Sequence, residues 1–464
     1  MSSINTVSNN KMGTMQIPKL IISTSIPLIF SLFVNQMYNL VDSVFVSHIN
    51  EDALTGISIA APIQVIMIAL GCGLAVGLNA RVSKALGEKN QEQAKQAASA
   101  AFIMAIASYL IIVILCLLIV EPYFEWQTKG NAVIAQYGIS YIRICMLFSF
   151  GQMTQWVFDR LLIATGKSTL FLVTLGTASI VNLILDPILI FGYLGFPALG
   201  TAGAAIATVT GQIAGGLLGI YLNVKRNKEI PIHFTLHISG KQVVNILKVG
   251  IPTAIMQGIM SVMGIIINTI LYQFSTTAVA IYGISIKVQN IAQIVVNGMN
   301  NGLIPIIAYN YGAKNEKRIK ETIRYAFIIA GVVMSIVFIT LELIPDKILL
   351  LFDASEHMMQ IGIPAMRLLS ISYFVSSVGI IFAAIYQGLG NGVYSMYLAF
   401  IRQVILLIPF LLIGVWMDQL VIVWLAFALA ETISIPSGIF FYKRLKKSIS
   451  KMTQTSHIDF SYAP

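Results

Sequence analysis

Charge is what this sequence has least of. Only 10% of its 464 residues are charged and 57% are hydrophobic, with a mean hydropathy of +0.83. An ordinary soluble domain carries about 25% charged residues. No polar stretch between the apolar segments is longer than the one around residues 224–248, so there is no soluble domain to hold an enzyme or a nucleotide-binding module. The composition therefore predicts an integral membrane protein.

Cysteine is nearly as scarce, with three residues in the whole chain. Cys72, Cys116 and Cys145 all fall within apolar segments, which is typical of small packing residues and argues against a disulfide framework. The chain also lacks a concentrated basic patch, because its net charge of +10 is spread over several short loops. We therefore expect no nucleic-acid partner.

Long apolar runs, by contrast, are abundant, and they predict twelve transmembrane helices. The first contains twenty-two uncharged residues from Leu20 to Val41, enough to cross a hydrocarbon core of about 30 Å. The even-numbered loops are rich in Lys and Arg, whereas the odd-numbered loops are acidic. Arg160 and Lys167 are assigned to the fourth loop. By the positive-inside rule both termini are expected on the cytoplasmic side of a cell inner membrane.

An internal repeat divides these segments into two sets of six. The stretch 86–90 recurs as 311–315, and Pro27 recurs as Pro252, both displaced by 225 positions. Because six is an even number, both copies enter the membrane from the same side. The prediction is an all-α polytopic protein with two six-helix lobes related by a pseudo-twofold axis along the membrane normal.

The repeat also sets the expected boundaries along the chain. They are a polar N-terminal segment at 1–16, an N-terminal lobe at 17–224, a cytoplasmic linker at 225–243, a C-terminal lobe at 244–445 and a polar cytoplasmic tail at 446–464.

The first apolar helix ends in a polar stripe. Asn35, Tyr38 and Asn39 lie seven, four and three residues before Asp42, so all four share one helical face. A carboxylate inside an apolar helix costs about 2.5–3.5 kcal/mol on insertion and is a functional candidate by default. Pro27 removes a backbone hydrogen bond from the same helix and is a candidate hinge.

A second carboxylate, Asp186, lies in the fifth apolar segment. Asn182 is four residues before it, and Pro187 follows it directly. Since proline cannot donate to the carbonyl of Leu183, we expect the helix to open here, as a second hinge. A freed carbonyl beside a carboxylate and an amide oxygen would suit a hard cation such as sodium.

Depth favours a single site for these groups. At about 1.5 Å per residue, Asp42 and Asp186 lie roughly 33 and 27 Å from the inner ends of their helices, and Thr208 lies about 10 Å below the outer end of the sixth. All belong to the outer half of the N-terminal lobe. The alternative is that each carboxylate only satisfies a neighbouring backbone or amide group.

The C-terminal lobe carries a different set of polar residues. Lys287, Arg402 and Glu431 are each expected near the membrane midplane, where they would either line a substrate cavity or compensate one another's charge. Gln257 and Gln289 would either bind substrate or join helices.

From about residue 16 to residue 447, the chain resembles the multidrug and toxic compound extrusion (MATE) family, and within it the DinF-type branch. The resemblance rests on the six-plus-six repeat with its proline mates, on Tyr38 with Asp42, on the Gly-Lys turn after the fourth helix, and on Asn182 with Asp186-Pro187. It implies cation-coupled export of amphipathic, often cationic compounds by alternating access. The implied proton or sodium site maps onto Asp42, Asn182, Asp186 and Thr208, with Tyr38 nearby.

The sequence departs from NorM-type members, which carry acidic residues in the seventh and tenth helices. Here those stretches offer Gln257 and Gln387, so a cation site in the C-terminal lobe is not expected.

The predicted function is thus a proton- or sodium-coupled antiporter that acts as a monomer in the lipid bilayer on small amphipathic substrates. It needs no cofactor, and no metal beyond a possible sodium ion at Asp42 and Asp186. An enzyme is not predicted, because no nucleophile with a base and no metal cluster is apparent. A lipid-linked oligosaccharide flippase of the same broader fold stays open, since Lys287 and Arg402 could meet a pyrophosphate.

Overall fold

The computed structural model describes residues 10–230, 239–352 and 354–458, and every element in these ranges is a helix. Parts of four predicted segments lie outside the described residues, namely 1–9 of the N-terminal segment, 231–238 of the linker, 353 of the C-terminal lobe and 459–464 of the tail. The N-terminal lobe contains α1 (Lys11–Thr14), α2 (Ile17–Ser47), α3 (Glu51–Gly87), α4 (Gln91–Thr128), α5 (Ala132–Leu147), α6 (Phe150–Ala164), α7 (Ser168–Phe191), η1 (Tyr193–Gly195) and α8 (Thr201–Arg226). The C-terminal lobe contains α9 (Gly240–Phe274), α10 (Thr276–Gly312), α11 (Glu316–Leu343), α12 (Pro345–Leu350), α13 (Glu356–Gly388), α14 (Gly392–Phe400), η2 (Ile401–Leu406), α15 (Leu407–Trp416) and α16 (Leu420–Ile458).

The predicted number of membrane spans is confirmed, with one span broken. In the described part of the chain, eleven helices are long and apolar enough to cross a membrane, where α14, η2 and α15 together count as one. A twelfth span is formed by α5 and α6, which meet at a 49° bend. The bend falls at Phe148 and Ser149, so the fourth predicted helix is two shorter ones.

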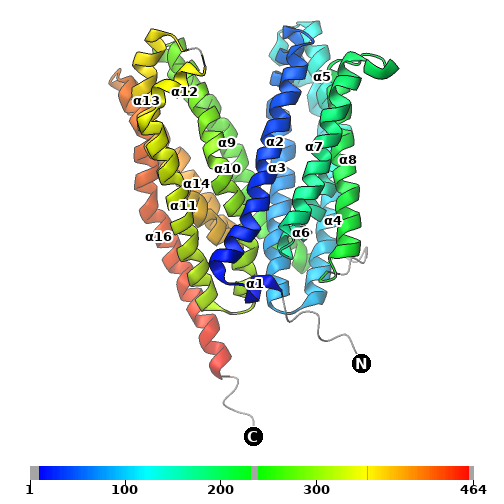
Figure 1. The fold of residues 1–464 in the computed structure, drawn as a ribbon, viewed down its shortest axis with the longest axis vertical. Coiled ribbons are helices and arrows are strands. Elements are labelled where there is room, and N and C mark those ends of the chain that lie inside the picture. Colours follow the sequence, from blue (N-terminus) through cyan, green and yellow to red (C-terminus); the bar gives the residue numbers. More distant parts are fainter. Residues whose placement is uncertain (1–9, 231–238, 353, 459–464) are drawn as a thin grey trace.

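The helices form two lobes that meet at one end and diverge at the other (Figure 1). The short helix α1 lies at the closed end, and both ends of the chain emerge there. Opposite lies the open end, where the tops of α2 and α5 stand apart from those of α9 and α13.

The sequence repeat is also present in the backbone. Lys89 and Lys314, which are 225 positions apart, follow equivalent helices and both adopt a left-handed conformation with φ of 55°. The next residue in each copy, Asn90 and Asn315, caps the following helix by accepting a hydrogen bond from a backbone N–H three residues on. Turn chemistry and helix starts are thus duplicated together.

The two lobes touch through glycines that obey the same symmetry. A Cβ atom at Gly87 would collide with the carbonyl oxygen of Tyr309, and a Cβ at Gly312 would collide with the carbonyl of Lys84. Gly312 and Tyr309 are the repeat mates of Gly87 and Lys84, so α3 and α10 make the same contact in both directions. This reciprocity is what a pseudo-twofold axis between the lobes requires.

The contact continues for several turns, and we call it the seam. A Cβ at Gly73 of α3 would lie 2.5 Å from the carbonyl oxygen of Gly250 in α9, and a Cβ at Gly298 of α10 would lie 2.5 Å from the side chain of Ile29 in α2. Only glycine allows helices to approach this closely. The seam therefore depends on small residues in both repeats.

Beyond the seam, the same helical faces are open. Ile291 lies seven residues from Gly298 on one face of α10, and it is 59% exposed. Phe33 follows Ile29 by one turn of α2 and is 44% exposed. The lobes are therefore separated over the remaining length of these helices.

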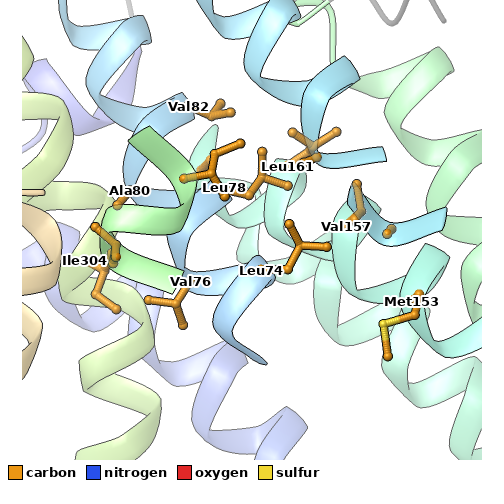
Figure 2. Packing of buried hydrophobic residues seen from close by; sticks show 14 of the residues in the cluster. Leu74, Val76, Leu78, Ala80, Val82, Met153, Val157, Leu161 and Ile304 are labelled. Carbon is orange, nitrogen blue, oxygen red and sulfur yellow. The ribbon is translucent and has the colours of Figure 1, made fainter. Parts of the chain in front are cut away.

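The core of the closed end is built around the inner half of α3. Nearly every residue from 71 to 87 is buried, as expected for a helix surrounded on all sides. Figure 2 shows Leu78 beside Leu161 of α6, whereas Ala80 lies on the other side, near Ile304 of α10. This helix therefore packs against both lobes.

The short helix α1 adds polar links between the lobes at the closed end. Arg318 of α11 donates hydrogen bonds to the carbonyls of Met12 (3.0 Å) and Met15 (2.8 Å). Asn10, which caps α1, donates a hydrogen bond to Glu229 after α8. The N-terminal turn is thus attached to both lobes.

Candidate functional site

Two carboxyl groups meet between α2 and α7 in the N-terminal lobe. Asp186 of α7 is fully buried, and Asp42 of α2 is half-buried. The two side chains lie within hydrogen-bonding reach of one another. Residues 144 positions apart in the sequence thus form one acidic site.

Close packing of α8 against α7 adds a third helix to the site. A Cβ at Gly211 of α8 would lie 2.5 Å from the carbonyl oxygen of Ala178, so only glycine permits this spacing. As a result Thr208 reaches Asn182, whose Nδ2 donates to Thr208 Oγ1 at 3.2 Å and to Asp186 Oδ1 at 3.3 Å. The structure brings together four of the predicted residues.

Several oxygen atoms of this group have no hydrogen-bond partner. They are the buried Asp42 Oδ1, Asp186 Oδ2 and Asn182 Oδ1. Buried polar atoms are nearly always paired, and an unpaired one costs about 1–3 kcal/mol. All three are acceptors, so a proton or a hard cation would satisfy them.

The residues of the polar stripe on α2 have different neighbours. Tyr38 lies close to the side chains of Asp42 and Asn35. Asn39 is exposed, and its amide donates to the backbone carbonyl of Asn35 at 2.8 Å. Tyr38 and Asn35 therefore border the acidic site, whereas Asn39 turns toward its own helix.

Two more residues near Asp42 were not predicted. Tyr141 and Cys145 of α5 are buried and lie within electrostatic range of the Asp42 carboxyl. The hydroxyl of Tyr141 accepts a hydrogen bond from Gln64 of α3 at 3.1 Å. The four-residue spacing of Tyr141 and Cys145 on one helical face was the available signal.

The predicted opening of the helix at Pro187 is wrong. Helix α7 continues through Pro187 to Phe191. Proline is tolerated inside membrane helices because neighbouring groups and small backbone adjustments compensate for one missing hydrogen bond. The free acceptors of the site are side-chain oxygens rather than an unwound carbonyl.

The C-terminal lobe holds an ion pair in place of a free acid. Arg402 Nη1 lies 3.4 Å from Glu431 Oε2, and both side chains are largely buried. Arg402 belongs to η2, a π-helical segment. A cavity of about 50 Å³ adjoins the pair and is lined by Gln289 and Gln403 among others.

Lys287 does not take part in this buried ion pair, and its predicted place in a substrate cavity stays a prediction. Lys287 is exposed, and its ammonium nitrogen lies 5.6 Å from the centre of the Phe352 ring. Its flexible stem carries the charge away from the lobe interior. Gln257 lies elsewhere again, at the seam, where it donates to Cys72 Sγ at 3.8 Å.

One predicted loop residue is in a helix. Arg160, assigned to the fourth loop, lies in α6 and donates to Asn301 Oδ1 of α10 at 2.7 Å. Its neighbour Asp159, which was not predicted, is buried and accepts a hydrogen bond from Thr174 of α7 at 2.5 Å. A charged pair inside an otherwise apolar run was the missed signal.

Comparison with known proteins gives one consistent answer. The model of the MatE family matches residues 27–188 and 252–413. The multidrug export protein MepA of Staphylococcus aureus (strain bovine RF122 / ET3-1) is 24% identical over 391 residues, 84% of this chain and 85% of its own length. The MepA of Staphylococcus haemolyticus is 24% identical over 428 residues, 92% and 93% of the two chains.

Solved structures have the same fold. One is described as an outward-facing conformation of a multidrug resistance MATE family transporter of the MOP superfamily. It superposes with a TM-score of 0.88 at 22% identity, covering 96% of this chain and 99% of the other. A MATE in complex with MaL6 has a TM-score of 0.88 at 24% identity and covers 97% and 100%.

Proposed function

The chain belongs to the MatE family, whose members are transporters rather than enzymes, and from that premise we propose that it is a cation-coupled antiporter. It exports amphipathic, often cationic compounds in exchange for a proton or a sodium ion. The observation that carries the proposal is the group of three unpaired acceptor oxygens on Asp42, Asp186 and Asn182.

The acidic site is suited to reversible binding of a cation. Two carboxylates in contact repel each other when both are charged, and a proton or sodium ion between them removes that repulsion. Asp42, Asp186, Asn182 and Thr208 supply oxygen ligands, which hard cations prefer. Binding also changes the charge of a helix, α2, that contacts the opposite lobe at the seam.

The two-lobe arrangement supports alternating access. The lobes are joined along the seam at the closed end and separated at the open end. Transport requires a second state in which the seam opens and the opposite end closes. The cation can shift this equilibrium only by the difference between its affinities for the two states.

Sidedness follows from charge. Lys and Arg are concentrated in the connections at the closed end, where both termini emerge, and the opposite connections are acidic. The positive-inside rule then makes the closed end cytoplasmic and the open end external. We infer a multi-pass protein of the bacterial inner membrane in its outward-open state.

The flippase alternative loses its main support. It needed several cations for a pyrophosphate, yet Lys287 lies against Phe352 and Arg402 is paired with Glu431. The exporter remains our proposal.

The test is transport by the purified protein in liposomes, with ethidium as the cationic probe. An imposed proton gradient and an imposed sodium gradient are applied separately. One of them is expected to drive ethidium transport, and Asp42→Asn is expected to abolish it while the protein stays folded. Asp52→Asn, which alters an exposed acid ten positions along the chain, is the matched control and should transport normally. Undiminished transport by Asp42→Asn would overturn the assignment.

A further inference from the structure

An arginine at the seam is not explained by the cation site. Arg160 leaves α6 toward the C-terminal lobe, where its Nη1 donates to Asn301 Oδ1 at 2.7 Å. Asn301 lies between Gly298 and Gly302 of α10, which both contact α2. The guanidinium therefore sits where the lobes begin to separate.

The charge of Arg160 has no carboxylate in contact with it. None of the ion pairs found in residues 10–230, 239–352 and 354–458 involves Arg160. Its neighbour Asp159 interacts with it only at longer range, because the Asp159 carboxylate turns into the lobe and accepts from Thr174. An arginine in a membrane segment is costly to insert and normally pairs or faces a water-filled space.

Arg160 keeps donors for a further group. Among the described residues its Nη1 donates to the neutral amide of Asn301, no hydrogen bond is found for Nε or Nη2, and the side chain is only partly buried. A guanidinium presents its N–H groups as a planar fork that matches a carboxylate or phosphate.

The surroundings of Arg160 are polar and come from both lobes. Cys72 of α3 is within its electrostatic range, and Gln257 of α9 donates to the Cys72 sulfur. On α10, the exposed Asn297 accepts from the amide of Asn301 at 3.0 Å. Further along α9, a Cβ at Gly264 would meet nothing within 4 Å. Arg160 thus lies in a polar part of the seam to which both lobes contribute.

We propose that Arg160 is the anion-recognition point of the substrate site and binds a carboxylate, sulfonate or phosphate group of the transported compound. The proposal rests on the transport function proposed above and deepens it. Asn301 holds the guanidinium in place and is a positioning residue.

Two dyes that differ by one methyl group test the proposal. Rhodamine 110 has a free carboxylate, and rhodamine 123 is its methyl ester. Equilibrium binding of each dye to the purified protein is followed by fluorescence anisotropy. Arg160→Gln is expected to weaken rhodamine 110 binding about tenfold or more, as for the loss of a charged hydrogen-bonding partner. Rhodamine 123 binding should change less than about twofold, because the ester carries no charge to lose.

Two further variants keep the test decisive. Arg160→Lys retains the charge but not the fork, so it should fold even if Arg160→Gln does not, and it should lose part of the preference. Arg143→Gln removes an arginine of the same lobe that pairs with Glu121, and it should leave both dyes unaffected. An equal effect of the Arg160 variants on both dyes, no effect on either, or no binding of rhodamine 110 by the native protein would overturn the proposal.

The binding measurement separates this inference from the proposed function. Failure of gradient-driven ethidium transport would count against the antiporter, whereas the ratio of the two dye affinities is measured at equilibrium and needs no ion gradient.

Discussion

The two lobes share a scaffold and differ in their charges. Both acids have apolar residues as their repeat mates. With the displacement of 225 positions, Asp42 corresponds to the buried Ile267. With the displacement of 224 positions that relates Gly166 to Gly390, Asp186 corresponds to Phe410. Caps, turns and seam glycines recur in both copies, but the acidic site exists once. The residues that fold the lobe are present in both copies, whereas the paired carboxyl groups are present in one.

The acid that the C-terminal lobe does contain is in a different electrostatic state. Glu431 is paired with Arg402 at 3.4 Å, so a tethered cation already occupies the place that an exchangeable ion would take. Asp42 and Asp186 have acceptors that no side chain satisfies. We therefore expect cation exchange in the N-terminal lobe and not in the other.

The largest expected effect is on coupling. Asp186→Asn should reduce gradient-driven transport at least about a hundredfold, since one of two charges that bind the ion is removed. Glu431→Gln should leave the response to the gradient intact, because its carboxylate is matched by Arg402. Ethidium transport in liposomes at several gradient sizes measures both. If Glu431→Gln uncouples transport and Asp186→Asn does not, the comparison of the lobes is reversed.

Stability should show the opposite pattern. Arg402→Gln leaves Glu431 as an unpaired buried charge and should lower the free energy of unfolding by about 3 kcal/mol. Both side chains of the pair are less than a fifth exposed, at 14% and 17%. Unfolding by SDS in mixed micelles measures the change.

Two controls accompany the Arg402 variant. Adding Glu431→Gln should restore most of the loss, because no unpaired charge remains. Arg367→Gln breaks an ion pair with Glu342 whose arginine is 53% exposed, and it should cost less than about 1 kcal/mol. Equal losses at the two arginines would mean that burial of the Arg402 pair has no energetic weight.

A smaller effect is expected at a pair of repeat mates that are both threonine. Thr208 accepts from Asn182 at the acidic site, whereas Thr432 donates to the carbonyl of Ala428 in its own helix at 2.8 Å. Thr208→Ala should weaken ion affinity about fivefold, the equivalent of one hydrogen bond. Thr432→Ala should not change it. The ion concentration that gives half-maximal transport reports the difference, and equal shifts would contradict it.

Much of this arrangement could be predicted from sequence. Span number, the repeat and the shared depth of Asp42, Asp186 and Thr208 follow from hydropathy, spacing and the fixed rise of a helix. All three depend on position along the helix axis, and the sequence determines that position well.

What the sequence did not predict depends on rotation about that axis. Arg160 and Asp159 are adjacent, yet one turns to the other lobe and its neighbour into its own. Depth alone left open whether Lys287 meets Arg402 and Glu431 or lines a cavity, and its ammonium lies over the Phe352 ring. Which face meets which neighbour is set by packing of small residues between helices, and one sequence does not contain that pairing.

The smallest effect on transport is expected for the repeat mates Pro27 and Pro252. It would show whether the two lobes also differ in how their first helices move. Pro27 is half-buried beside the exposed Ile26, whereas Pro252 is buried. A bend at Pro27 can therefore occur with fewer packing contacts broken than one at Pro252. If α2 rearranges when the ion binds, Pro27→Ala should slow transport about threefold without changing ion affinity, because a continuous hydrogen-bond ladder stiffens the helix. Pro252→Ala should leave the rate within about twofold. Initial rates in liposomes at saturating ion decide between them, and equal rates in both variants would assign the motion to whole lobes rather than to α2.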